Sequence, residues 1–318
     1  MSDFAASAVR RFYLNNWIPI GSLATLLAVC LALTDFYVQV DSELLKELGP
    51  PIALAVVAHL GLSNQWIRLS YTLGTIAQLK LLYPVATSLT FVAATAQLPL
   101  QDDYLAYADR MFGLDWRSYY SFFINDHPSS IPYLYFGYAM IAWPMFGIPI
   151  ILGASGHHLR LQQFVLACMI TIIVTGLISV VTPAMGTFLE YGITPDISKF
   201  NPSGYIAQVQ RLPLVRDGSL RILSPATLGG IISFPSFHAA AAVLSLWALW
   251  SVWWMRPLAL IANVSMLVAT PLGGGHYFVD VFAGIFLAVS AISLARLIGN
   301  LSVRATSIST MRVASVIA

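Results

Sequence analysis

The sequence contains few charged residues. Only 9% of its 318 residues are Asp, Glu, Lys or Arg, whereas a typical soluble domain has about a quarter. Hydrophobic residues make up 58% of the chain. A surface facing water needs more charge than this chain supplies. The composition therefore excludes an ordinary soluble domain and predicts an integral membrane protein surrounded by a lipid bilayer.

Cysteine and basic runs are also scarce. The two cysteines, Cys30 and Cys168, both fall in apolar stretches, which excludes a disulfide framework and a zinc or iron–sulfur ligand set. The net charge of +2 comes from dispersed basic residues, so nucleic acid is not an expected partner. We therefore predict neither a metal nor another cofactor.

Long apolar stretches predict an all-α, polytopic transmembrane helical bundle of about eight spans. The second stretch is the weakest, because His59 and Asn64 interrupt it, and whether it crosses the membrane sets the topology of everything that follows. The expected spans cover residues 17–38, 51–66, 71–98, 133–152, 161–181, 236–255, 258–271 and 276–298.

Polarity divides the chain into N-terminal membrane helices (1–70), a catalytic membrane core (71–298) and a cytoplasmic tail (299–318). Within the core, segment 99–132 mixes aromatic and charged residues and is expected to lie at the membrane interface, and hydrophilic segment 182–233 is expected to form an outer loop. Basic residues beside short turns place the N-terminus inside. They are Arg10, Arg11, Arg68, Arg160, Arg256, Arg304 and Arg312.

The run His276-Tyr277-Phe278-Val279-Asp280 begins the last span. A histidine and an aspartate four residues apart on a helix lie on one face, so the carboxylate can hold one ring nitrogen and leave the other free to react. Ionisable groups in a membrane segment usually mark a functional site. The alternative is a helix start in which Asp280 satisfies backbone N–H groups and His276 faces water.

A second histidine stands in Pro235-Ser236-Phe237-His238, again at the start of an apolar helix. Ser236 and the free N–H groups of this first helical turn, including that of Phe237, could bind an anion. One out-and-back hairpin separates the two histidines. Both are therefore expected on the same, outer side of the membrane.

Three arginines of the 182–233 segment, Arg211, Arg216 and Arg221, are expected on that side too. Guanidinium groups bind phosphate through paired hydrogen bonds, so arginines facing two imidazoles predict a phosphate ester site. Contact with lipid headgroups or a solvated loop face is the alternative for each of them. For Lys80, inside the third span, we expect a structural role, with a snorkelling or hydrogen-bonded ammonium.

These motifs resemble the type 2 phosphatidic acid phosphatase superfamily over roughly residues 99–298. Ser236 to His238 is similar to its P-S-G-H signature, and His276 with Asp280 to its H-x-x-x-D signature, most closely in the inositol phosphorylceramide synthase branch. The first signature, K-x6-R-P, is absent, and Arg110 with Arg117 is the nearest counterpart. Thr270 stands where the family has an arginine, and Phe237 replaces a glycine.

The resemblance implies a six-helix lipid phosphatase-like core and metal-independent phosphoryl transfer in two steps. His276 would be the nucleophile that forms a phosphohistidine, and Asp280 would orient it. His238 would protonate the leaving alcohol and then activate water or an acceptor hydroxyl. Ser236 and the N–H groups around it would hold the phosphate oxygens.

The leading hypothesis is therefore a lipid phosphatase acting on a membrane lipid with a phosphate or phosphodiester headgroup, in a bacterial inner membrane with its site on the outer side. A headgroup transferase using a polar hydroxyl acceptor is the alternative. A lipid transporter or a non-catalytic scaffold is a further one, although the sequence shows no internal repeat of the kind that transporters contain.

Overall fold

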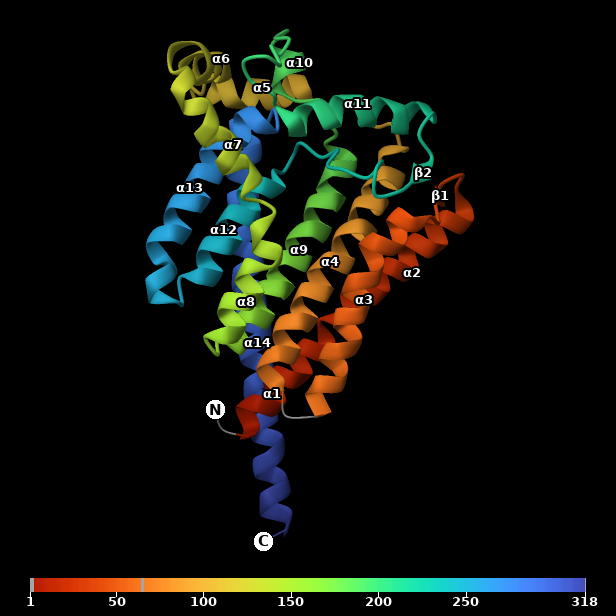
Figure 1. Cartoon of the computed structure of the whole chain (residues 1–318), viewed down its shortest axis with the longest axis vertical. Coiled ribbons are helices and arrows are strands. Elements are labelled where there is room, and N and C mark those ends of the chain that lie inside the picture. The colour runs from red at the N-terminus through yellow and green to blue at the C-terminus, as the bar shows by residue number, and fades with distance from the viewer. Residues whose placement is uncertain (1–2, 64–65, 318) are drawn as a thin grey trace.

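The computed structural model describes residues 3–63 and 66–317, with side chains described for 6–62 and 66–302. Its long helices run roughly side by side along the longest axis of the molecule (Figure 1). Six helices in this part of the chain are long and apolar enough to cross a membrane. They are Ala6–Leu33, which joins the end of α1 (Asp3–Asn15) to α2 (Trp17–Leu33), then α3 (Ser42–Ser63), α4 (Ile67–Ala94), α9 (His158–Val181), α13 (Arg256–Gly273) and the first part of α14 (Phe278–Ile317). The predicted all-α polytopic bundle is confirmed.

Two of the expected spans take a different form. The one predicted over 133–152 is split into α7 (Ile131–Ala139) and α8 (Gly147–Ala154). Segment Pro128–Met145, which contains α7 and ends in the short 3₁₀ turn Trp143–Met145, is bent by 52° relative to α8. Pro144 in that turn has no N–H for a continuous helix. The one predicted over 236–255 is α12 (Phe237–Leu249), whose 13 residues extend only about 20 Å at 1.5 Å each. The bent pair would be a seventh span, and α12 lies where the eighth is expected.

Short helices cross one end of the bundle (Figure 1). They are α5 (Asp102–Met111), α6 (Trp116–Tyr120), α10 (Thr187–Glu190) and α11 (Ser203–Asp217). Helix α11 lies in the segment that the sequence predicted as a loop, and its buried residues Tyr205, Gln208, Leu212 and Val215 recur every three or four positions. Beside it, β1 (Tyr37–Val38) and β2 (Ile222–Leu223) pair in parallel. We call this the capped end.

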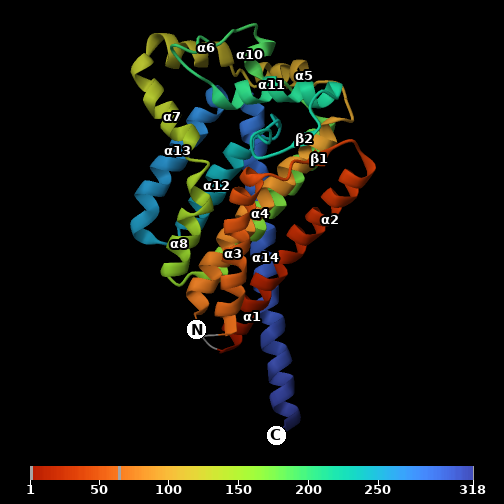
Figure 2. The same ribbon diagram turned by 45° about the vertical axis from the view of Figure 1, so that its right-hand side comes forward.

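The N-terminus and the last part of α14 lie at the opposite end (Figures 1 and 2). The first turns of α4, α9 and α13 also lie away from the capped end. Those turns adjoin Arg68, Arg160 and Arg256, which the sequence assigns to a single membrane side. The side chains of Arg304 and Arg312 lie outside the described residues.

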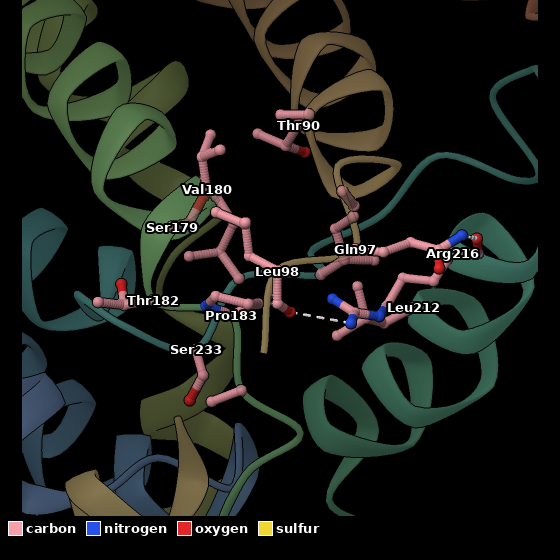
Figure 3. Close-up of a pocket in the computed structure, with 15 residues that line it drawn as sticks. Thr90, Gln97, Leu98, Ser179, Val180, Thr182, Pro183, Leu212, Arg216 and Ser233 are labelled. Atoms are coloured by element: carbon pink, nitrogen blue, oxygen red, sulfur yellow. Dashed lines mark hydrogen bonds between the residues drawn. The ribbon is translucent and has the colours of Figure 1, made fainter. Parts of the chain in front are cut away.

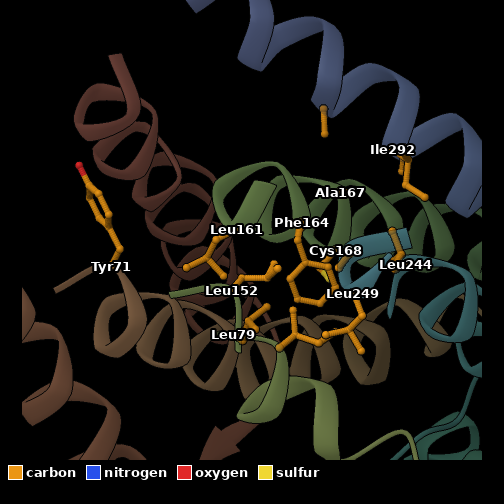
Figure 4. Close-up of a cluster of buried hydrophobic side chains, with 14 of the residues drawn as sticks. Tyr71, Leu79, Leu152, Leu161, Phe164, Ala167, Cys168, Leu244, Leu249 and Ile292 are labelled. Atoms are coloured by element: carbon orange, nitrogen blue, oxygen red, sulfur yellow. The ribbon is translucent and has the colours of Figure 1, made fainter. Parts of the chain in front are cut away.

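An apolar core fills the space between α4, α8, α9, α12 and α14 (Figure 4). Leu79, Leu152, Phe164, Leu244 and Ile292 are among its buried members. Lys80, next to this core on α4, places its Nζ 2.9 Å from Oε1 of Glu47 on α3. Its partner is therefore a carboxylate on the neighbouring helix, which supports the structural role expected for this lysine.

Helices α12 and α14 cross closely at Gly284. A Cβ atom at this position would overlap the carbonyl oxygen of Ser236 and lie 3.2 Å from the Cβ of Ala239. Because these are backbone and short side-chain atoms, Gly284→Ala must push α12 away. We expect a loss of about 1–3 kcal/mol in stability and a lower melting temperature in detergent.

Gly21→Ala is the matched control, since nothing lies within 4 Å of a Cβ added at Gly21 on α2. Alanine is the better helix former, so this variant should melt no lower than the wild type. Equal melting temperatures for Gly284→Ala and the wild type would contradict the close crossing.

Candidate active site

His276 and Asp280 lie together at the start of α14. The spacing predicted that His276 lies on one face of the helix with Asp280. The helix begins at Phe278, so His276 instead lies just before it. Nδ1 of His276 is 3.2 Å from Oδ2 of Asp280, and the two residues are 4% and 0% exposed. His276 therefore does not face open water, and Nε2 is the ring nitrogen left for chemistry.

Asp280 also organises the chain around it. Its Oδ2 accepts hydrogen bonds from the backbone N–H of Tyr277, at 3.0 Å, and from the hydroxyl of Ser233, at 2.9 Å. Free N–H groups at a helix start favour a negative charge there. Asp280 thus caps α14 and also holds His276. The two roles that the sequence offered as alternatives for Asp280 therefore occur together, although His276 does not face water.

His238 faces His276 from the first turn of α12. The two ring centroids are 6.4 Å apart, so one small group placed between the rings can contact both. The ring of His238 stacks on Tyr138 of α7, with centroids 4.1 Å apart, and its Nε2 is buried without a hydrogen-bond partner in the described chain. One imidazole is held by a carboxylate, and the other keeps a free nitrogen.

Ser236 is the N-cap of α12 and is fully buried. Its Oγ accepts from the N–H of Ala239 at 3.4 Å, and its own N–H donates to the carbonyl of Asp280 at 3.0 Å. Its N–H therefore has a protein partner and its hydroxyl oxygen accepts one bond, while no acceptor for the hydroxyl proton lies within the described chain. The next N–H groups, of Phe237 and His238, begin the helix and have no carbonyl four residues back within it. They are the groups best placed to receive an anion.

The five arginines predicted to bind phosphate are placed differently from one another. Within the described residues, none forms a hydrogen bond or ion pair with either histidine or with Asp280. Arg117 donates to the carbonyl of Tyr191, Arg216 to that of Leu98 and Arg221 to that of Val215. Arg110 is exposed, and the guanidinium of Arg211 lies against Gly229. These last two guanidinium groups have no hydrogen-bond partner in the described chain, and Nη1 of Arg216 is buried and has none there either.

A small cavity lies beside Ser233, between the ends of α4 and α9 and the side of α11 (Figure 3). Its volume is about 20 Å³, and its polar lining includes Thr182, Ser233 and Arg216. Such a volume accommodates about one water molecule. Because Ser233 donates to Asp280, this cavity adjoins the histidine site.

Two acidic residues of α5 join the site, although the sequence placed them only in the interfacial segment. Asp109 is 0% exposed and accepts the N–H groups of Phe278 and Val279, at 2.9 and 2.8 Å. Asp102 accepts the hydroxyl of Tyr277 at 2.9 Å. The sequence could have indicated that these two residues act together. They are seven residues, or two helical turns, apart, which puts both on one face of a helix.

Burial raises the pKa of Asp109 to about 6, and the nearby charge of Asp280 acts in the same direction. The two backbone N–H groups that Asp109 accepts lower the pKa and oppose this effect. The carboxylate is therefore mostly ionised at neutral pH. It adds a second negative charge at the start of α14.

No curated protein and no solved structure matches the chain. A family model described as the PAP2 superfamily matches residues 103–294, which is more than half of the chain and runs from α5 into α14. This range contains both histidines and Asp280. The match supports the superfamily and not the inositol phosphorylceramide synthase branch. Members of this superfamily are phosphatases or phosphotransferases. This chain, an integral membrane protein with a pair of facing histidines at the capped end, belongs to the PAP2 superfamily.

Proposed function

We propose that the protein is a membrane lipid phosphatase that works through a phosphohistidine. The observation that carries this proposal is the pairing of two imidazoles 6.4 Å apart, of which one is held at Nδ1 by a buried carboxylate. A nucleophile oriented by one group and faced by an acid–base residue is the arrangement that covalent catalysis requires.

In the first step, Nε2 of His276 attacks the phosphorus of the lipid phosphate. The bond from phosphorus to the lipid oxygen breaks, and His238 donates a proton to that oxygen. In the second step, His238 takes a proton from water as the water oxygen attacks the phosphohistidine. Inorganic phosphate leaves, and both imidazoles return to their starting states. The N–H groups of Phe237 and His238 would stabilise the phosphate oxygens.

The surroundings of Phe237 support an apolar substrate. A cavity of about 70 Å³ is lined almost entirely by apolar atoms of α4, α9, α12 and the α7–α8 bend. Phe237, Ala241 and Leu244 form its α12 wall, and Phe237 directly precedes His238. This cavity would take the part of an acyl chain nearest the headgroup.

Two further assignments concern the cations that bind the phosphate and the acceptor of the phosphoryl group. Arg211 and Arg110 are our candidates for cations that approach the phosphate, because the other three predicted arginines already donate to backbone carbonyls. The cavity beside Ser233 has a volume of about 20 Å³, room for about one water molecule, which supports water over a sugar-sized hydroxyl as the acceptor. Both assignments place the chemistry at the capped end, which we assign to the outer side of the membrane.

The test uses purified protein in detergent with dioleoyl phosphatidic acid, with and without EDTA, while free phosphate and new lipids are followed together. We expect phosphate release that EDTA leaves unchanged. A parallel assay offers phosphatidylinositol as the donor together with a lipid that bears a free hydroxyl. Formation of a new phosphodiester lipid without free phosphate in that assay would instead show a headgroup transferase of the inositol phosphorylceramide synthase type. Absence of turnover with all lipid phosphates tried would contradict both.

A further inference from the structure

The chain that carries His276 is held from outside by helix α5. Both oxygens of Asp109 accept N–H groups of α14, Oδ2 from Phe278 and Oδ1 from Val279. These are the first two N–H groups of α14, which have no carbonyl four residues back within the helix. A cap usually comes from the residue next to the helix. Here the capping carboxylate comes from a separate helix, α5, about 170 residues earlier in the chain.

Asp102, also on α5, contacts the same segment at Tyr277. Its Oδ1 accepts the hydroxyl of Tyr277 at 2.9 Å and the N–H of Gly186 at 2.8 Å. Thr187, next to Gly186, donates its N–H to the carbonyl of Gly275 at 2.9 Å. Gly186 has a φ of 99°, and a Cβ there would lie 2.7 Å from that carbonyl oxygen. Residues on both sides of His276 are therefore tied to groups outside α14.

A carboxylate at this position is costly unless its hydrogen bonds compensate for the loss of water. Asp109 is fully covered and stands near the charge of Asp280, so helix capping alone does not require this placement. An exposed Ser or Asn would cap a helix at a lower cost. The buried carboxylate of Asp109, which accepts two hydrogen bonds, additionally fixes the position of the first turn of α14. Asp280 projects from that turn.

We infer that Asp109 is a positioning residue for phosphoryl transfer: it fixes the start of α14 so that Asp280 holds Nδ1 of His276 and Nε2 faces His238. Asp102 supports the same segment through Tyr277. The expected effect of Asp109 on the rate of phosphoryl transfer rests on the proposed function. Its effect on the position of His276 rests on the observed contacts alone. Asp109 itself touches neither substrate nor the reacting atoms.

Asp109→Asn tests this inference, with Asp103→Asn as the control. Asparagine keeps the size of the side chain but presents an NH₂ group to one of the two backbone N–H groups. Misplacing a reacting group by about 1 Å costs about 100-fold in rate. We expect kcat for dioleoyl phosphatidic acid to fall by about that factor with KM within two-fold of wild type. Asp103, exposed on the same helix, should tolerate the change.

A purely structural cap would give another result. It would lower the melting temperature while leaving kcat unchanged at temperatures well below the melting point. That outcome would overturn the inference. Should Asp109→Asn not fold, Asp109→Glu serves instead, because its carboxylate keeps both acceptor oxygens but shifts the turn by one methylene. A wild-type kcat in the folded Glu variant would overturn the inference equally.

A second readout does not depend on the substrate. The rate at which diethyl pyrocarbonate modifies His276, followed by mass spectrometry, reports the position and partner of this imidazole. We expect a change of more than three-fold in Asp109→Asn and none in Asp103→Asn, and equal rates in both would overturn the inference. If the wild type hydrolyses no lipid phosphate, the proposed function fails, yet the modification rate still decides whether Asp109 positions His276.

Discussion

Replacing His276 by alanine should lower the hydrolysis of phosphatidic acid by at least about 1,000-fold, because the variant has no group to form the covalent intermediate. His276 is the imidazole whose Nδ1 is held by Asp280, and a water molecule cannot take its place in a two-step route.

The measurement is turnover together with trapping of the intermediate. Phosphatidic acid labelled with ³²P in its phosphate should label the wild type, and the label should survive base and be lost in acid, as a phosphoramidate is. His276→Ala should carry no label. His127→Ala is the control, because His127 lies at the same end of the molecule but is exposed. Full activity of His276→Ala, or a label on another residue, would refute the mechanism.

His238→Ala should show a loss that depends on the leaving group. General acid catalysis typically contributes about 100- to 10,000-fold, so hydrolysis of phosphatidic acid, whose leaving alcohol must be protonated, should fall by such a factor. With 4-nitrophenyl phosphate the leaving phenolate needs no proton. The first step should then recover, while the second step stays slow because the base that activates water is missing.

This predicts a burst of nitrophenolate equal to the enzyme present, followed by slow turnover, and a phosphoenzyme that accumulates. Ser251→Ala is the control just after α12, since within the described chain its hydroxyl donates only to the carbonyl of Ala248. If the first step were slowed equally on both substrates, so that 4-nitrophenyl phosphate gave no burst, His238 would be removed from the role of acid. Wild-type rates on both would remove it from the reaction.

Several features of the fold could be predicted because they depend on local properties of the chain. Lipid requires apolar side chains and internally satisfied backbone groups, so long apolar stretches indicate helices wherever they occur. The sequence also predicted the break between spans 236–255 and 258–271, where Pro257 lies in the first turn of α13. The weak second stretch forms α3, which has the length and composition of a span.

The bend between α7 and α8 and the helix α11 were not predicted. Pro144 and its neighbours are as apolar as the helices around them, so hydropathy did not mark the break. In α11, Arg211 and Arg216 concealed the spacing of Tyr205, Leu212 and Val215, which face the bundle. Hydropathy averages over a window, whereas packing depends on which face of a helix each side chain occupies.

The sequence by itself determined the membrane character of the protein, its helical class and the two motifs, since each follows from residues close together in the chain. The tertiary structure decided the distance between His238 and His276, the pairing of three arginines with backbone carbonyls and the capping of α14 by Asp109. Apart from Arg221 and Val215, which are six positions apart, those contacts join residues that are tens of positions to 170 positions apart. Their geometry depends on how whole helices cross, which no local pattern of side chains encodes.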